Sequence, residues 1–314
     1  MTYFITGGAG FIGSSLANYV LSIGERVVVI DDLSMGKKSN LLKHENLTFI
    51  EGSVTDYDLM EKIYKDFKFD YIFHLAAVAS VADSILRPIE THEVNYISVL
   101  RNIELLKKYQ KYISRVVFAS SAAIYGDDPI LPKKETSRII PLNQYAIDKF
   151  ASERTVINAY KLYGIKTSAV RFFNVFGKNK NPNSPYSGVI SILMKNYFDC
   201  LNGKESHFKL YGDGNQSRDF IYVEDVITAL MLISQHKESV GQVYNIGTGK
   251  ETSLNQIINF LDNVYSINLP IEYMNKRIGD IEKSVADISN LKKLGFSCQF
   301  STFEGLKDFI QKTN

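Results

Sequence analysis

Short apolar runs alternate with segments of helical periodicity through the first half of the chain. Residues 12–23 and 94–109 carry apolar side chains three and four positions apart, which is typical of helices packed on one face. The alternation predicts parallel β-α-β units, and hence an α/β fold of the Rossmann type with a doubly wound parallel sheet. The apolar runs that read as its buried strands lie at 3–6, 26–30, 47–50, 71–75, 115–120 and 167–171.

The alternating pattern ends at Gly177, where a stretch rich in Asn, Pro, Ser and Gly begins. Such a stretch predicts a loop and a boundary between two parts of the chain. Beyond it we expect a helix at 189–201 and an extended segment at 208–211. The segments at 219–223 and 243–246 are expected to return to the main sheet.

These boundaries predict two domains. Residues 1–176, with returns near 219–248, would form a dinucleotide-binding Rossmann domain. Residues 177–218 and 249–314 would form a smaller C-terminal α/β lobe that binds the substrate.

Composition narrows the choice of partners. The chain has 314 residues and a net charge of +2, so no basic surface field indicates nucleic acid or an anionic membrane. The first apolar run begins at residue 3, so we expect no signal peptide and a cytoplasmic protein. Cys200 and Cys298 are far apart and lack ligand spacing, so we expect no disulfide and no metal site.

A glycine-rich turn joins the first predicted strand to the first predicted helix. Residues 6–13 read T-G-G-A-G-F-I-G. Backbone amides in such a turn can approach a pyrophosphate, whose charge is favoured at the positive end of the helix. The residues expected to bind a dinucleotide here are Gly7, Gly10, Phe11, Ile12 and Gly13.

Two carboxylates, Asp31 and Asp32, end the second predicted strand. An acidic side chain at this position can accept hydrogen bonds from the adenosine ribose hydroxyls. The same charge repels a 2′-phosphate, which favours NAD over NADP. The alternative is that Asp31 serves only as a turn carboxylate or helix cap.

A tyrosine and a lysine lie four residues apart, as Tyr145 and Lys149, at the start of a predicted helix, and therefore share one face. A nearby ammonium should lower the pKa of a tyrosine from about 10 towards neutrality. Such a tyrosine can take a proton from a sugar hydroxyl while hydride leaves the same carbon. Ser121, at the end of the fifth predicted strand, can hold that hydroxyl; the alternative for Ser121 is turn capping.

With these residues assembled, the sequence resembles the extended short-chain dehydrogenase/reductases, and within them the UDP-glucose / UDP-N-acetylglucosamine 4-epimerases, nearly from end to end. The resemblance implies NAD as cofactor, a UDP-sugar as substrate and a homodimer. Besides the glycine turn and the Tyr-Lys pair, it is carried by H-L-A-A at 74–77, V-N at 94–95, R-F-F-N-V-F-G at 171–177, P-N-S-P-Y-S-G-V-I at 182–190, G-D-G at 212–214, R-D-F-I-Y-V-E-D-V at 218–226, N-I-G-T-G at 245–249 and R-I-G-D at 277–280.

The resemblance also implies roles for individual residues. Ser121, Tyr145 and Lys149 would be catalytic, with Lys149 also on the nicotinamide ribose. Arg218 and Arg277 can neutralise a diphosphate with forked hydrogen bonds. Further cofactor contacts would be Ser53, Val54, Leu75, Ala76, Ala77 and Asn95. The implied substrate contacts are Ser121, Ala122, Asn174, Val189, Leu210, Tyr211, Arg218, Arg277, Asp280 and Ser284.

Departures from the family pattern affect the choice of reaction. Related 4,6-dehydratases and decarboxylases carry an acidic residue after the catalytic Ser or Thr, where this chain has Ala122 and Ala123. Two alanines favour 4-epimerisation through a transient 4-keto sugar. The alternatives are a UDP-uronate 4-epimerase, another NDP-sugar epimerase or a dehydratase. A non-catalytic NAD-sensing protein is a further alternative, although such proteins are expected to lose the Tyr-Lys pair.

Other departures concern the ligands themselves. Ser53 stands where many relatives have an Asp for the adenine amino group, and Ala79 where some have a lysine. Ala123 replaces a Thr of the galactose epimerases. Ser284 occupies the position that lies against C2 of the sugar in the resembling enzymes, where a small residue is associated with N-acetylated sugars. The alternative is that Ser284 lies on a surface loop.

Overall fold

The computed structural model describes residues 1–179, 188–276 and 281–312, and its largest feature is a seven-stranded parallel sheet. The strand order is β11-β6-β5-β4-β1-β2-β3, which winds outwards in both directions from the β1-β4 pair. The doubly wound α/β fold is therefore confirmed. The strands are β1 (Thr2–Thr6), β2 (Arg26–Asp31), β3 (Leu47–Glu51), β4 (Tyr71–His74), β5 (Arg115–Ser121), β6 (Thr167–Phe172) and β11 (Val243–Ile246).

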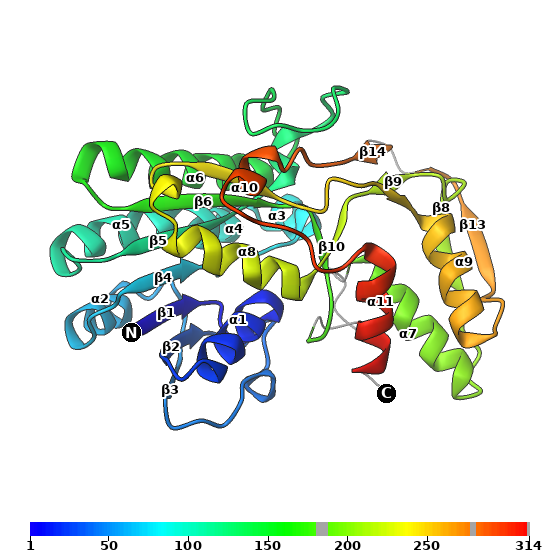
Figure 1. The fold of residues 1–314 in the computed structure, drawn as a ribbon, viewed down its shortest axis with the longest axis horizontal. Helices are drawn as coiled ribbons and strands as arrows, with labels where there is room; N and C mark the ends of the chain where they lie inside the picture. The colour runs from blue at the N-terminus through cyan, green and yellow to red at the C-terminus, as the bar shows by residue number, and fades with distance from the viewer. Residues whose placement is uncertain (180–187, 277–280, 313–314) are drawn as a thin grey trace.

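Helices cover both faces of this sheet (Figure 1). One face is covered by α2 (Tyr57–Asp66), α5 (Ser98–Tyr109) and α6 (Gln144–Tyr163). The other is covered by α1 (Phe11–Ser22) and α8 (Val223–Gln235). Shorter elements connect them: η1 (Lys38–Asn40), α3 (Val81–Leu86), α4 (Pro88–His92), the π-helical turn η2 (Glu93–Ile97), η3 (Ala122–Tyr125) and η4 (Lys237–Ser239).

The apolar runs form strands because both faces of the sheet are buried. In β1, Tyr3 and Ile5 belong to the core beneath α1 and α8, whereas Phe4 belongs to the core beneath α2, α5 and α6. All three side chains are at most 1% exposed. A central parallel strand needs apolar residues on both sides, so it reads as a continuous run instead of an alternating one.

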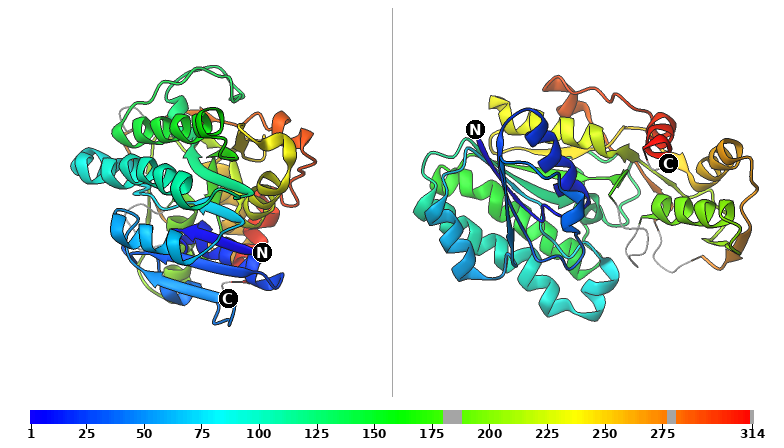
Figure 2. Two further views of the ribbon diagram at one scale, coloured as in Figure 1. Left: turned by 90° about the vertical axis from the view of Figure 1, so that its left-hand side faces the viewer. Right: turned by 90° about the horizontal axis from the view of Figure 1, so that it is seen from below.

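A smaller lobe follows the sheet and lies at one end of it in the right-hand view of Figure 2. Its core is continuous with the sheet, because Leu193 and Ile257 belong to the same apolar cluster as Leu16 and Val226. Its elements are α7 (Val189–Leu201), the parallel pair β8 (Phe208–Tyr211) and β13 (Ile271–Met274), the small sheet of β12 (Thr252–Ser253), β9 (Ser217–Arg218) and β14 (Lys283–Ser284), and the helices α9 (Leu254–Tyr265) and α11 (Thr302–Gln311). The short helix α10 (Ser289–Lys293) lies instead against β11 of the main sheet.

The expected return at 219–223 is wrong as regards the main sheet. Its strand, β10 (Phe220–Tyr222), pairs with β7 (Asn174–Phe176) in a separate two-stranded sheet. The edge of β6 is already taken by β11, so β10 pairs with the strand that continues beyond β6. The chain does return through α8 and β11, and the domain boundaries at 1–176, 177–218 and 249–314 stay predictions.

Candidate active site

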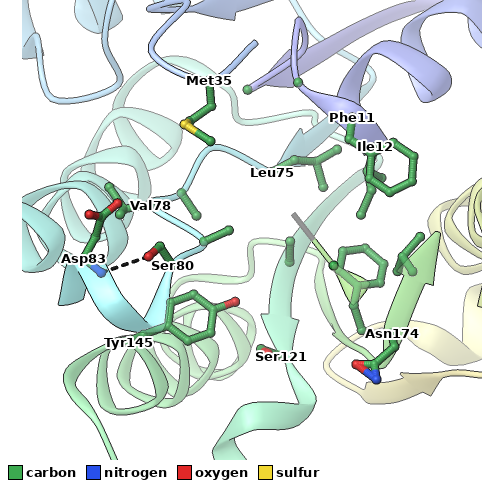
Figure 3. A pocket seen from close by; sticks show the side chains of 18 of the residues that line it. Phe11, Ile12, Met35, Leu75, Val78, Ser80, Asp83, Ser121, Tyr145 and Asn174 are labelled. Carbon is green, nitrogen blue, oxygen red and sulfur yellow. Dashed lines mark hydrogen bonds between the residues drawn. The ribbon is translucent and has the colours of Figure 1, made fainter. Parts of the chain in front are cut away.

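A cavity of about 1250 Å³ opens at the carboxyl ends of the sheet strands, where they face the smaller lobe (Figure 3). Its wall combines the segments that follow β1, β2, β4, β5 and β6 with α7, β8 and β9. Ligands of open α/β sheets bind at this edge. An ordinary ligand pocket measures about 300–1,000 Å³, so this cavity has room for a dinucleotide together with a substrate.

The glycine turn forms one side of the cavity, with Gly7, Gly10, Phe11, Ile12 and Gly13 all in the wall. Gly7 has a φ of +68°, and a Cβ there would come within 2.8 Å of the Ala76 Cα. A Cβ at Gly13 would run into the Gly7 carbonyl oxygen and lie 2.7 Å from the Gly8 Cα. Only glycine fits these two positions, so the turn is closed tightly against the start of α1. The N-terminus of α1 thereby faces the cavity, as anion binding requires.

Asp31 supports this turn from the end of β2. Its Oδ2 accepts a hydrogen bond from the Ala9 amide and its Oδ1 accepts one from the Leu33 amide, both over 2.9 Å. Burial raises the pKa of the Asp31 carboxyl. The turn role offered as the alternative for Asp31 is thus present, but the residue also lies in the cavity wall. Each carboxylate oxygen keeps a second lone pair for a ligand hydroxyl.

Asp32 also lies in the wall, but on its exposed side. Its Oδ1 accepts hydrogen bonds from the amide of Ser34 over 3.0 Å and from its hydroxyl over 2.6 Å. Asp32 therefore shapes the start of the loop after β2, where Met35 and Gly36 join the wall. No pattern in the sequence pointed to Met35 or Gly36.

The segment after β4 forms the floor of the cavity. Leu75, Ala76 and Ala77 line it as expected, together with Val78, Ala79 and Ser80. Asn95 is 1% exposed and is not part of the wall. It holds the backbone of Val78 instead, since its side chain accepts a hydrogen bond from the Val78 amide over 2.8 Å and donates one to the Val78 carbonyl over 3.1 Å. Asn95 belongs to the π-helical turn η2, and π-helical turns are frequent at functional sites.

Two other expected contacts also lie outside the wall, although Val54 lies in it. The Ser53 hydroxyl pairs with that of Thr55 over 2.8 Å, which closes the turn before α2. Ala122 packs instead against the apolar cluster of Ile124 and Phe173.

The three residues expected to be catalytic come together on the cavity wall. Tyr145 and Lys149 extend from α6, which begins at a cap made by the Asn143 side chain on the Ala146 amide. Ser121 ends β5, and Figure 3 shows it on the same side of the cavity as the Tyr145 hydroxyl. The Ser121 Oγ also accepts from the Ala123 amide over 3.2 Å, so the capping alternative and the cavity position coexist.

The pKa of Tyr145 departs from the sequence expectation. Burial raises it, and a hydrogen bond with the Ser121 hydroxyl opposes the rise. Lys149 is 3% exposed, and burial lowers its pKa to about 7. The expectation that Lys149 pulls the pKa of the tyrosine towards neutrality is therefore wrong for the protein alone, because desolvation of Tyr145 outweighs the opposing hydrogen bond.

The smaller lobe supplies the other side of the cavity. Asn174, Val189, Leu210, Tyr211 and Arg218 all lie in the wall. The Arg218 Nη1 donates to the carbonyls of Ser217, over 2.9 Å, and Glu282, over 3.2 Å. These bonds hold the guanidinium at the edge of β9, in the cavity wall.

The remaining substrate candidates concern the strand beside Arg218. Arg277 and Asp280 lie outside the described residues. Ser284 is not part of the wall, but it lies in β14 in parallel register with Arg218. Directly paired residues of neighbouring strands point to the same face, so the Ser284 side chain shares a face with Arg218. Ser284 thus lies in a short strand and not in a loop, and its contact with the sugar stays a prediction.

The sequence reasoning missed the short helices between β4 and η2. Ser80, Asp83, Arg87, Glu90 and Thr91 all belong to the wall. The Ser80 hydroxyl caps α3 by accepting from the Asp83 amide over 2.8 Å (Figure 3). The pattern S-x-x-D after a strand is a helix-start signal that marks this segment.

Two further properties concern the described parts of the chain. Within them, no cluster of three or more His, Cys, Asp or Glu side chains is suited to hold a metal ion. No helix in these ranges has both the length and the apolar character needed to cross a membrane.

Comparison with known proteins agrees with this geometry. The model of the NAD dependent epimerase/dehydratase family matches residues 3–247. The chain belongs to this family. Its cofactor is therefore NAD, in agreement with the glycine turn and the acidic end of β2. A solved relative, the UDP-glucose 4-epimerase of Thermus thermophilus in complex with NAD, has a TM-score of 0.88 at 28% identity, covering 99% of this chain and 98% of its own.

Two solved structures with higher sequence identity to this chain are named for different sugars. The UDP-N-acetylglucosamine 4-epimerase of Methanobrevibacter ruminantium, in complex with UDP-N-acetylmuramic acid, is 37% identical over 99% of this chain and 97% of its own, with a TM-score of 0.90. The UDP-glucose 4-epimerase of Thermotoga maritima, with UDP-glucose, is 35% identical over 100% and 99%, with a TM-score of 0.91. A putative UDP-glucose 4-epimerase of Methanocaldococcus jannaschii is 33% identical over 98% of this chain and 96% of its own.

Proposed function

We propose that this enzyme is an NAD-dependent 4-epimerase of UDP-sugars. The observation that carries the proposal is the meeting of Ser121, Tyr145 and Lys149 on the wall of one cavity that also contains the glycine turn. The names of the relatives, which include UDP-glucose and UDP-N-acetylglucosamine 4-epimerases, support the same reaction.

Tyr145 and Ser121 have different roles at C4 of the sugar. NAD, when bound, supplies the hydride acceptor for C4 and the donor for the return. The Tyr145 phenolate takes the proton of the C4 hydroxyl as the C4–H bond breaks, which leaves a 4-keto sugar. Ser121 donates a hydrogen bond to the C4 oxygen and orients it. After the keto sugar has turned over, the hydride returns to the opposite face of C4 and Tyr145 returns the proton to the oxygen. Atoms and electrons therefore balance over the cycle.

The sugar nucleotide would lie between the sheet and the smaller lobe. Arg218 is positioned to meet a diphosphate, because its guanidinium is anchored to strand carbonyls and lies in the cavity wall. Asn174, Val189, Leu210 and Tyr211 would enclose the rest of the ligand, with Arg277 and Asp280 as further proposed contacts.

We infer that the preferred sugars are N-acetylated. Ser284 shares a strand face with Arg218, so it lies beside the proposed diphosphate contact. A serine leaves space for an acetamido group that a larger side chain would fill. Ala122 and Ala123, which follow Ser121, have no acid-base capacity, and this favours epimerisation over dehydration.

A homodimer is part of this proposal. Apolar side chains on the helices beside the active-site sheet are exposed, with Leu86 at 77% and Ile89 at 79%. A second copy of the chain would cover them. Sedimentation of the purified protein tests this point, and a monomer at micromolar concentration would contradict it.

The deciding experiment is incubation of the purified enzyme with single UDP-sugars and chromatographic separation of the C4 epimers. Each UDP-hexose, UDP-N-acetylhexosamine and UDP-uronate is tested separately. Absorbance at 340 nm is followed during turnover with excess NAD. We expect epimer formation without accumulation of NADH, because the hydride returns within each cycle. NADH that accumulates in proportion to product would indicate a dehydrogenase and refute the proposal.

A further inference from the structure

Asp148 directly precedes Lys149 on α6 and is 0% exposed. Its Oδ1 is held from two sides. The Gln144 Nε2 donates to it over 2.7 Å, and the His92 Nδ1 of α4 lies 2.7 Å from it. The carboxylate is therefore fixed between two helices, next in the chain to a lysine of the active site.

The other oxygen of this carboxylate is unusual. Asp148 Oδ2 is buried and, within the described residues, has no hydrogen-bond partner. A buried carboxylate with an unpartnered oxygen costs free energy, and an asparagine or serine would avoid most of that cost. The link between α4 and α6 therefore does not by itself explain why a charged side chain stands at position 148.

The surroundings of Lys149 explain the charge of Asp148. Its ammonium donates to the Ala119 carbonyl over 2.8 Å, and the rings of Phe118 and Tyr145 lie 5.1 and 6.0 Å from it. This neutral environment favours the uncharged amine: burial lowers the pKa of Lys149 to about 7, and the charge of Asp148 opposes that decrease.

We propose that Asp148 is a positioning residue whose fixed negative charge keeps Lys149 protonated during turnover, and that His92 and Gln144 hold this charge in place. The proposal rests on the epimerase function proposed above. An ammonium at Lys149 stabilises the Tyr145 phenolate, so Asp148 would act on the reaction through two neighbours and without touching the sugar.

Other titratable groups around α6 are either paired with a group of opposite charge or kept neutral. On α3, Asp83 and Arg87 form an ion pair over 3.4 Å. Further along α6, Glu153 is paired with Arg171 over 2.7 Å. On β4, burial lowers the pKa of His74 to about 3, so this ring stays neutral.

The side chains that hold the Asp148 carboxylate are His92 and Gln144, and neither carries the permanent charge of an arginine.

The test is the pH profile of kcat for Asp148→Asn, with Asp148→Ser as a second variant. Loss of the negative charge makes Lys149 lose its proton at lower pH, so the ammonium that stabilises the Tyr145 phenolate is lost at lower pH. The basic limb of the profile should therefore move towards acid by about one pH unit. Asp148→Glu should restore the wild-type limb. Glu93→Gln removes an exposed carboxylate next to His92 and should leave the profile in place.

A second readout does not depend on turnover. NMR of protein labelled at lysine Cε, with Lys149 assigned through Lys149→Arg, follows the titration of this side chain directly. Asp148→Asn should shift that titration towards acid by the same amount. If both the basic limb and the titration stay unchanged while only the rate or Tm falls, Asp148 merely ties the helices and the proposal is overturned. A wild type that epimerises no UDP-sugar would refute the proposed function, and the NMR titration would still decide the role of Asp148.

Discussion

The ammonium of Lys149 donates a hydrogen bond to the main-chain oxygen of Ala119 over 2.8 Å. Ala119 lies two residues before Ser121 on β5, and Lys149 lies one helical turn after Tyr145 on α6. The bond therefore ties the helix that carries the phenol to the strand that carries the serine. Because the two hydroxyls belong to elements fixed in this way, their relative position does not depend on a flexible loop.

The first prediction concerns the proton transfer. Tyr145→Phe should lower turnover by about 10²–10⁴-fold, the usual range for a lost general base. Folding and NAD binding should change little, because Tyr145 faces the cavity and the lysine bond to Ala119 stays. Ser121→Ala should reduce turnover by less, since it removes a hydrogen bond and not the base. Steady-state rates and the NAD content of the purified variants are measured; wild-type turnover of Tyr145→Phe would disprove the mechanism.

The second prediction concerns the glycine turn. Gly13→Ala should abolish NAD binding or prevent folding, because the new Cβ would collide with the Gly7 carbonyl and lie 2.7 Å from the Gly8 Cα. Gly24→Ala is the control: a Cβ there meets no atom within 4 Å, but its φ of +81° is strained. It should cost about 1 kcal/mol of stability and leave NAD binding intact. NAD titration and thermal unfolding distinguish the two, and normal NAD affinity in Gly13→Ala would contradict the close packing.

The third prediction separates the two roles of Asp31. Asp31→Ala should weaken NAD binding by about 10- to 100-fold, because a charged hydrogen-bond acceptor is lost. It should weaken NADP binding less, since the repulsion of the 2′-phosphate disappears as well. Asp32→Ala, which removes the exposed neighbour, should change both affinities less. Calorimetric titration with both cofactors gives the answer. Equal losses for NAD and NADP would mean that Asp31 serves only the glycine turn.

The sequence was sufficient for the main sheet and for the glycine turn. All six predicted strands occur, and all but the edge strand β3 are buried along most of their length, which is why they read as apolar runs. The glycine turn was predictable because its spacing follows from backbone contacts within one short segment.

Contacts that depend on tertiary packing were not predictable in the same way. β10 pairs with β7 because β11 occupies the edge of β6, and no local pattern encodes that competition. Burial raises the pKa of Tyr145, whereas the sequence predicted a lower value. The spacing of Tyr145 and Lys149 indicates that they are close, but it does not indicate how deeply the phenol is buried. Asn95 was expected to contact the cofactor, yet its side chain bonds to the Val78 backbone.

The fourth prediction concerns stability in acid. Burial lowers the pKa of His74 to about 3 in the folded protein, against about 6.5 in an unfolded chain. Between these values the unfolded chain binds a proton that the folded protein does not, so His74 makes stability fall as pH falls from 6.5 towards 3. In His74→Gln the free energy of unfolding should fall less steeply, by up to about 1.4 kcal/mol per pH unit.

Urea denaturation of wild type and His74→Gln at several pH values measures these slopes. His44→Gln, which removes an exposed histidine, is measured alongside as the control. Equal slopes in all three proteins would show that His74 is able to bind its proton in the folded state.

The last prediction concerns the sugar, and it follows from the register between β14 and β9. Ser284 pairs with Arg218, so a larger side chain at 284 would extend on the face that carries the proposed diphosphate contact. We expect the wild type to interconvert UDP-GlcNAc and UDP-GalNAc at least as well as UDP-Glc and UDP-Gal. Ser284→Tyr should suppress the N-acetylated pair much more than the plain pair, because a phenol fills the volume that the acetamido group needs.

Two variants make this argument specific to volume on one face of the strand. Ser284→Ala removes only the hydroxyl, whose hydrogen bond contributes about 0.5–1.5 kcal/mol, so its loss should be about tenfold or less. Lys283→Tyr introduces the same phenol one residue earlier, where the side chain points to the opposite face of β14 and is exposed. It should leave the ratio of kcat/KM for the two pairs unchanged. Equal losses on both pairs in Ser284→Tyr, or a wild type inactive on N-acetylated sugars, would refute the role of Ser284 and leave the epimerase proposal intact.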